Sequence, residues 1–237
     1  WPDGVLEPVS FSAYKGEILG LSGQLGSGAG EVLASIAGAL KSRSGSLTLN
    51  GETFLPKSPS QAIKKKIAYC SSDRKKDGLF LGRPIFENLT SPALTAISQY
   101  GFNFGSTEQD YSKNLAKEFL IDVKRIFDES GLLSGGNQQK VALGKWLSIQ
   151  PDVLLVNEPT RGVDVGAKSE IYQRMRDLAA RGITIIFAST DIQEITYLPD
   201  RVITFYRGMM IDEHRLENIQ TPTILKEITD PFNETNL

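Results

Sequence analysis

The sequence predicts an α/β fold with a mainly parallel sheet, an antiparallel β-hairpin region and an inserted helical subdomain. Three observations support this prediction. Short apolar runs alternate with helix-like segments in the first and last parts of the chain, as is typical of parallel α/β sheets. The run at 153–156 is apolar throughout, as expected of a strand buried on both faces. Residues 80–147 show helical patterns and few strand signals.

The first elements lie around a glycine-rich loop. A short apolar run at 16–23 ends in this loop, and residues 31–40 continue with helical character. Residues 45–54 then alternate apolar and polar side chains around Asn50-Gly51, which is a two-residue turn signal. This part of the chain is therefore predicted to form a strand, a loop, a helix and a hairpin.

The later elements follow the same logic. Residues 65–70 predict another short strand, and 167–181 form a well-patterned helix that ends at Gly182, a predicted C-cap. Two further strands are expected at 183–190 and 200–208. We find no internal repeat and no low-complexity segment.

Composition excludes several classes of function. The formal net charge is −2 at pH 7 and the isoelectric point is about 5.6. The overall charge therefore does not favour binding to nucleic acid. The basic runs at 64–66 and 74–76 are interpreted as solvated faces. The single cysteine, Cys70, excludes an intrachain disulfide and is interpreted as a small buried hydrophobe. The only histidine, His214, is expected at the surface.

No apolar run approaches the ~18 residues that span a bilayer, and no signal peptide is visible. The chain begins with Trp1 rather than Met, so we expect it to be a fragment of a longer or processed protein.

The segment "GQLGSGAGE" at 23–31 has the glycines of a phosphate-binding loop without its reactive side chains. The pattern is G-x-x-x-x-G-K-[ST]. Gly23 and Gly28 have the right separation, but Ala29 stands at the Lys position and Gly30 at the Ser or Thr position. The candidate nucleotide-binding residues of this loop are Gly23, Gly26, Ser27, Gly28, Ala29, Gly30 and Glu31.

The segment "LSGGNQQK" at 133–140 resembles the signature motif of ABC ATPases, in a form common in bacterial sugar importers. Ser134, Gly135 and Gly136 are expected just before a helix that starts near Asn137, where backbone N–H groups and the helix dipole favour an anion. Gln138 completes the candidate set. A serine-capped helix that binds no ligand is the simpler alternative.

The segment "VLLVNEPTRGVDVGAKSEIY" at 153–172 resembles the strand that carries the Walker B acid, the catalytic Glu and the D-loop. Glu158 matches the catalytic Glu and Asp164 matches the D-loop Asp. Asn157 stands where a metal-holding Asp is expected, and an amide brings no charge to Mg²⁺.

These three motifs, in this order, resemble the ATP-binding domains of ABC transporters, which have a P-loop NTPase fold, over about residues 5–210. The segments at 68–80 and 158–168 are most similar to the second of two fused ATPase domains in ribose- and galactose-type importers. The resemblance implies a RecA-like core at 1–78 and 149–212, a helical signature subdomain at 79–148 and a C-terminal tail at 213–237.

The departures from the family pattern affect one composite site. Besides Ala29, Gly30 and Asn157, Ser72 stands where the family has a Gln, and Thr190 stands where it has a His. Phosphoryl transfer depends on positioning and charge stabilisation, and each lost donor costs about 3–4 kcal/mol. We therefore expect no measurable turnover, and Glu158 is interpreted as vestigial.

The resemblance also implies partners. Two such domains close head to tail, so the complete signature here would complete the ATP site of a second domain with an intact phosphate loop, in the same polypeptide. The cofactor is ATP, with Mg²⁺ weak or absent in the chain's own site. A membrane permease would dock on the helical subdomain, with "LFLGRPIFENL" at 79–89 as the candidate contact or, equally, as simple packing.

A periplasmic or extracellular sugar-binding protein would act indirectly, and the domain would lie on the cytoplasmic face of the bacterial membrane. Two alternatives remain open: an independently active ATPase that relies on Glu158, and a soluble ABC protein that acts on nucleic acid or ribosomes. Trp1 and Tyr14 are the nearest candidates for stacking on adenine.

Overall fold

A computed structural model describes residues 7–41, 45–94 and 105–232. Within these residues, no helix is both long enough and apolar enough to cross a membrane. The predicted adenine contact at Trp1 lies outside the described residues.

The chain divides into two compact units, which are described one at a time. The first unit comprises residues 1–69, 152–158 and 176–237, and the second comprises 70–151 and 159–175. The predicted boundaries of a core and a helical signature subdomain remain a prediction.

The first unit is built on a mainly parallel sheet, which confirms the predicted fold class. Within the described residues the sheet has six strands in the order β4-β5-β6-β1-β7-β8. Strand β1 pairs in parallel with β6 and β7, β5 pairs in parallel with β6, and β8 is antiparallel to β7. The strands are β1 (Ile18–Gly23), β4 (Ile67–Cys70), β5 (Val153–Asn157), β6 (Thr184–Ser189), β7 (Arg201–Tyr206) and β8 (Met209–Arg215).

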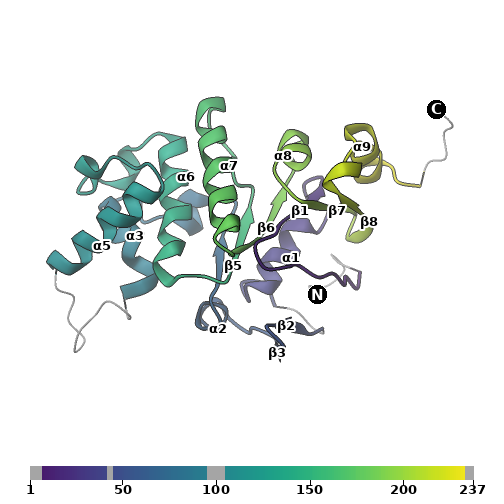
Figure 1. Ribbon diagram of the computed structural model, residues 1–237, viewed down its shortest axis with the longest axis horizontal. Helices are drawn as coiled ribbons and strands as arrows, with labels where there is room; N and C mark the ends of the chain where they lie inside the picture. The colour runs from purple at the N-terminus through teal and green to yellow at the C-terminus, as the bar shows by residue number, and fades with distance from the viewer. Residues whose placement is uncertain (1–6, 42–44, 95–104, 233–237) are drawn as a thin grey trace. The chain divides into compact units, whose positions relative to one another are not determined.

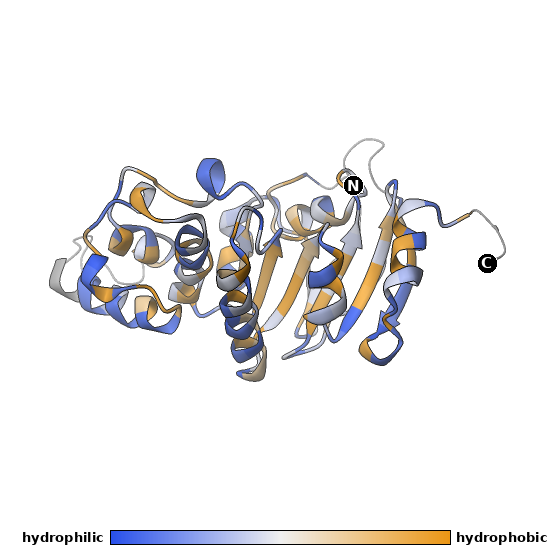
Figure 2. Cartoon of the chain, turned by 90° about the horizontal axis from the view of Figure 1, so that it is seen from above, coloured by the Kyte–Doolittle hydropathy of each residue, from blue (hydrophilic) through white to orange (hydrophobic). Residues whose placement is uncertain are grey.

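Helices cover both faces of this sheet. Helix α1 (Ala29–Ile36) packs on one side, and α8 (Ile192–Tyr197) and α9 (Thr221–Thr229) pack on the other (Figure 1). The central strands are coloured as hydrophobic in Figure 2, and every residue of β1 and β6 is buried. Because both faces are covered, these strands lack the alternating pattern of a half-exposed sheet.

The hairpin predicted around Asn50-Gly51 is present. Strand β2 (Leu47–Leu49) pairs in antiparallel fashion with β3 (Glu52–Phe54). The φ angles are 51° at Asn50 and 83° at Gly51. Two successive residues with positive φ are the requirement of a type I′ turn, which explains the Asn-Gly pair. The short helix α2 (Pro59–Lys64) follows.

Residues 209–229 form more regular structure than their sequence pattern indicates. Strand β8 and helix α9 pack against β7. His214 was expected at the surface, but its side chain is mostly covered. Its side chain is only 12% exposed and its Nε2 lies 2.9 Å from Glu227 on α9. Thr204 on β7 donates a hydrogen bond to the same carboxylate at 2.7 Å. These contacts tie α9 to the sheet.

The second unit is mainly helical. Its helices are α3 (Ile85–Thr90), α5 (Gly105–Glu118), α6 (Gly135–Gly144) and the first part of α7 (Val165–Ala180), with short 3₁₀ or π turns at 74–78, 91–93, 123–125, 130–132 and 145–149. Cys70 is 2% exposed, as predicted. Burial raises the pKa of its thiol to about 11, so the thiol stays protonated and unreactive.

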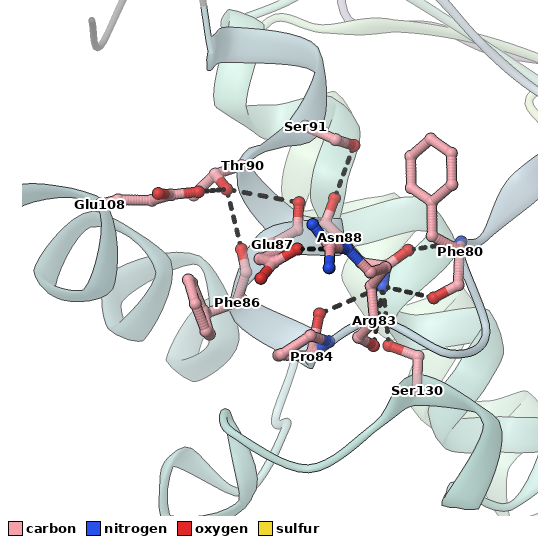
Figure 3. A network of polar contacts seen from close by, with 10 residues as sticks. All are labelled: Phe80, Arg83, Pro84, Phe86, Glu87, Asn88, Thr90, Ser91, Glu108 and Ser130. Carbon is pink, nitrogen blue, oxygen red and sulfur yellow. Dashed lines mark hydrogen bonds and ion pairs between the residues drawn. The ribbon is translucent and has the colours of Figure 1, made fainter. Parts of the chain in front are cut away.

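The turn at 80–84 is shaped by a buried asparagine, Asn88 (Figure 3). Its side-chain oxygen accepts from the Phe80 N–H at 2.8 Å, and its amide donates to the carbonyls of Phe80, Arg83 and Pro84. The amide also contacts the Ser130 hydroxyl at 3.0 Å. Because Asn88 is only 1% exposed, these bonds replace water for several backbone groups at once.

Candidate functional site

The predicted phosphate-binding loop connects β1 to α1 through two glycines in left-handed conformations. The φ angles are 80° at Gly26 and 103° at Gly28, a region in which a side chain is strained. A Cβ on Gly23 would lie 2.1 Å from the Ser27 hydroxyl oxygen. The three glycines therefore allow the backbone to fold tightly around Ser27, which is buried.

The loop leads directly into the first turn of α1. The N-cap is Gly28, which offers no side-chain hydrogen bond, so the first N–H groups of the helix have no partner from within it. These groups belong to Ala29, Gly30 and Glu31. Together with the positive end of the helix dipole, they form a region that favours an anion. Ala29 is buried and brings no charge to it.

Asn157, at the end of β5, lies beside the first turn of α1. A Cβ built on Gly30 would lie 2.8 Å from the Asn157 Nδ2 and 3.3 Å from its Oδ1. Asn157 is half-buried. Thus the side chain at 157 occupies the space that a side chain at 30 would need.

Glu158 follows in a left-handed conformation, with a φ of 55°, which is uncommon for a residue with a side chain. Its backbone N–H donates to the Ala188 carbonyl at 2.8 Å. Its side-chain Oε1 accepts from the Thr190 N–H at 2.9 Å. The carboxylate is therefore engaged with the backbone that follows β6, and the Thr190 side chain is exposed.

The segment at 133–140, which is predicted to be a signature motif and is called the signature below, includes the start of α6. Ser134 is the N-cap, and its hydroxyl accepts from the Asn137 N–H at 3.4 Å. The helix begins at Gly135, so the expected start near Asn137 is two residues late. The sequence interpretation placed both glycines before the helix, whereas the Ser134 cap places them in its first turn.

Both signature glycines are packed against residues 162–167 of the same unit. A Cβ on Gly135 would lie 2.6 Å from the Gly162 carbonyl oxygen and 2.9 Å from the Arg74 guanidinium. A Cβ on Gly136 would lie 2.7 Å from the Ala167 Cβ. Only glycine therefore fits at either position without movement of its neighbours.

Arg74 holds this contact together and was missed by the sequence analysis. Its Nη1 donates to the Arg161 carbonyl at 2.5 Å, its Nη2 to the Gly162 carbonyl at 3.3 Å, and its Nε to the Gln138 side chain at 3.5 Å. The interpretation of 74–76 as a solvated face is therefore wrong for Arg74. Because the bonds to Arg161 and Gly162 join residues more than 80 positions apart in sequence, no local pattern could have indicated them.

The other predicted residues have identifiable positions. Asp164 accepts from the Ala167 N–H at 3.0 Å, which caps α7. Gln138 is buried, and its amide donates to the Leu133 carbonyl at 3.2 Å. Ser72 lies in the second unit and is half-buried. Tyr14 is 62% exposed, and the Arg201 guanidinium lies 5.2 Å from its ring centre.

The structure thus assembles two groups of predicted residues. In the first unit, the loop at 23–31 lies with Asn157, and Glu158 lies with Thr190. In the second unit, Ser134, Gly135 and Gly136 lie with Asp164.

Comparison with known proteins gives consistent matches. Residues 6–161 match the family model described as ABC transporter. The chain is 44% identical over 207 residues to a ribose import ATP-binding protein RbsA of Streptococcus agalactiae. This alignment covers 87% of this chain and 42% of the relative. It is 40% identical over 228 residues to the protein of the same name from Geobacillus kaustophilus, which covers 95% and 46%. The chain therefore spans less than half the length of these curated relatives.

Solved structures show the same fold at lower identity. A nucleotide-free ATP-binding cassette from an ABC transporter superposes with a TM-score of 0.76 at 21% identity, over 89% of this chain and 85% of the other. A dimeric ATP-binding cassette bound to ADP and Pi superposes with a TM-score of 0.78 at 21% identity, over 91% and 92%.

Proposed function

The chain belongs to the ABC transporter family, and from this premise we propose that it is one ATP-binding domain of a bacterial sugar importer. In this proposal its own ATP site is degenerate. Its intact signature completes the ATP site of a second domain. ATP is the shared cofactor of both sites.

The proposed substrate and partner domain rest on the relatives. Those that align over most of this chain are named ribose import ATP-binding proteins. A monosaccharide such as ribose is therefore the proposed cargo. Because these relatives are about twice as long as the chain, they have room for a second ATP-binding domain in one polypeptide.

Five substitutions support a degenerate site: Ala29, Gly30, Asn157, Ser72 and Thr190 stand where the family has groups that hold phosphate, metal or water. In the first unit, no charge is available at position 29 or 157. Each lost donor to a transferring group is worth about 3–4 kcal/mol. The Glu158 carboxylate is held by the Thr190 N–H, which supports a structural role for it.

The observation that carries the proposal is the geometry of the signature. Ser134 is exposed at the start of α6, and the two glycines after it are fixed by the contact with Gly162 and Ala167. A capped, glycine-lined helix start that is held rigidly suits an anion supplied by another chain or domain.

The proposed permease contact is the segment at 79–89. Phe80 is 62% exposed, and the Asn88 network fixes the turn that carries it (Figure 3). An aromatic side chain on a rigid turn is a suitable anchor for a protein partner. In the assembled importer the domain would then lie at the cytoplasmic face of the membrane, and a sugar-binding protein would act through the permease.

The test is Ser134→Arg in the assembled transporter, with Ser60→Arg as the matched control. Ser60 is also exposed near the start of a helix, α2, so the control adds the same bulk and charge. Transport-coupled ATP turnover should fall by more than tenfold with Ser134→Arg and stay unchanged with Ser60→Arg. Unchanged turnover in both variants would refute the role of the signature.

A further inference from the structure

Magnesium is the ion that the family fold implies beside the phosphates, and the residues present do not suit it. Mg²⁺ is usually held by one or two carboxylates and by the phosphates of the substrate. At this site the side chain at 157 is an amide and position 30 has no side chain. Within the described residues, the one cluster of three metal-binding groups is Asp212, His214 and Glu227, on β8 and α9.

The two missing metal-binding groups are linked sterically. A Ser or Thr at position 30 would place its Cβ 2.8 Å from the Asn157 Nδ2, closer than side chains pack. The present position of the Asn157 amide and a hydroxyl-bearing residue at 30 therefore exclude one another. The absence of a side chain at position 30 therefore leaves the space that the Asn157 amide occupies.

The Asn157 amide is also available to a ligand. It is half-buried, and within the described part of the chain its side chain makes no hydrogen bond. An amide nitrogen offers two N–H donors. It lies beside Gly30, in the first turn of α1, where the backbone N–H groups have no helical acceptors. All these donors favour an anion.

We propose that this site binds the phosphates of an adenine nucleotide without a divalent cation, with the Asn157 amide as a direct donor to them. The proposal rests on the proposed function, in which the loop at 23–31 belongs to the chain's own, degenerate ATP site. It goes further, since it assigns Asn157 a binding role and reverses the usual dependence on Mg²⁺. A nucleotide held in this way would be bound and not hydrolysed.

The experiment measures ADP binding to the purified chain by isothermal titration calorimetry, in EDTA and in excess Mg²⁺. ADP is chosen because turnover cannot change its concentration. The wild-type chain should bind ADP in EDTA at least as tightly as in Mg²⁺, since the cation screens the phosphate charge that the donors attract.

Two variants test the residue itself. Asn157→Asp places a carboxylate against the phosphates, so affinity in EDTA should fall about tenfold or more, and Mg²⁺ should now restore it. Asn50→Asp is the matched control, since it adds the same charge at the exposed hairpin turn and should leave affinity unchanged. Gly30→Ser should also weaken binding in EDTA, because its Cβ displaces the amide. It serves as the second variant if Asn157→Asp does not fold.

Wild-type binding that requires Mg²⁺, absence of binding in both conditions, or equal binding by Asn157→Asp and Asn50→Asp in EDTA would each overturn the inference. None of these results would affect the proposed role of the signature, which is tested separately by Ser134→Arg in the assembled transporter.

Discussion

The packing of the signature against residues 162–167 predicts a measurable cost for one methyl group at Gly135. In Gly135→Ala the new Cβ would lie 2.6 Å from the Gly162 carbonyl oxygen and 2.9 Å from the Arg74 guanidinium. The arginine can move, but the carbonyl belongs to the backbone. The variant must therefore shift either the start of α6 or the loop at 161–163.

The magnitude follows from two opposing effects. Inserting a methyl group into a close-packed contact costs about 1–3 kcal/mol. Replacing glycine by alanine in a helix returns roughly 0.5–1 kcal/mol. These ranges allow a net loss of unfolding free energy of about 0–2.5 kcal/mol; we expect about 1 kcal/mol, near the middle, which lowers the melting temperature by roughly 2–4 °C for a protein of this size.

The assay is thermal unfolding of the purified chain, with Gly82→Ala as the matched control. Gly82 lies in the same unit, and a Cβ there would meet no atom within 4 Å. The control should therefore change stability by less than about 0.5 kcal/mol. Equal melting temperatures for the two variants would show that the glycine contact is loose and would refute the reasoning.

Three further predictions concern buried or engaged side chains. At pH 8, Cys70 should react with iodoacetamide about 100-fold more slowly in the folded chain than in urea, because burial raises its pKa from 9.0 to about 11. The unfolding free energy should also fall as pH rises from 9.0 to about 11, since the thiol of the unfolded chain ionises first. Equal labelling rates in the folded chain and in urea would contradict the burial of Cys70. Asn88→Ala should lower the unfolding free energy by about 2–4 kcal/mol in urea titrations, because it leaves buried backbone groups unpaired. Asn114→Ala, at an exposed site on α5, should not lower it. Similar urea midpoints for the two variants would rule out the stabilising role of the Asn88 network. Glu158→Ala should lower the unfolding free energy by about 1–2 kcal/mol, because it removes the acceptor of the Thr190 N–H. Glu158→Gln keeps a carbonyl acceptor and should lower it less. A larger loss in Glu158→Gln than in Glu158→Ala would argue against a structural role for Glu158.

Some elements of the fold could be predicted from local sequence patterns alone. The Asn50-Gly51 turn was predictable because few residue pairs accept two positive φ angles. The strands β5 and β6 were predictable because burial on both faces leaves uninterrupted apolar runs. Strand β8 has an exposed and partly polar pattern, so its pairing with β7 is a tertiary effect that no local signal carries.

The candidate site was predictable in its residue types but not in its contacts. The glycine spacing and the signature-like motif predicted loops that lead into helices, and helices begin at Ala29 and Gly135. The proximity of Gly30 and Asn157 depends on β5 lying beside α1, and these residues are far apart in sequence. Arg74 reaches Arg161 and Gly162 for the same reason. His214 was assigned to the surface because its neighbours are polar, although α9 covers it through Glu227.

The central claim is that this domain does not hydrolyse ATP at its own loop and serves another domain's site. The most direct measurement is Mg²⁺-ATP turnover by the purified chain over a wide range of protein concentration, with Glu158→Gln measured in parallel. We expect the wild-type rate to equal that of Glu158→Gln at every concentration. A rate that rises with concentration and disappears in Glu158→Gln would contradict this account, because the chain would then be an active ATPase despite Ala29, Gly30 and Asn157.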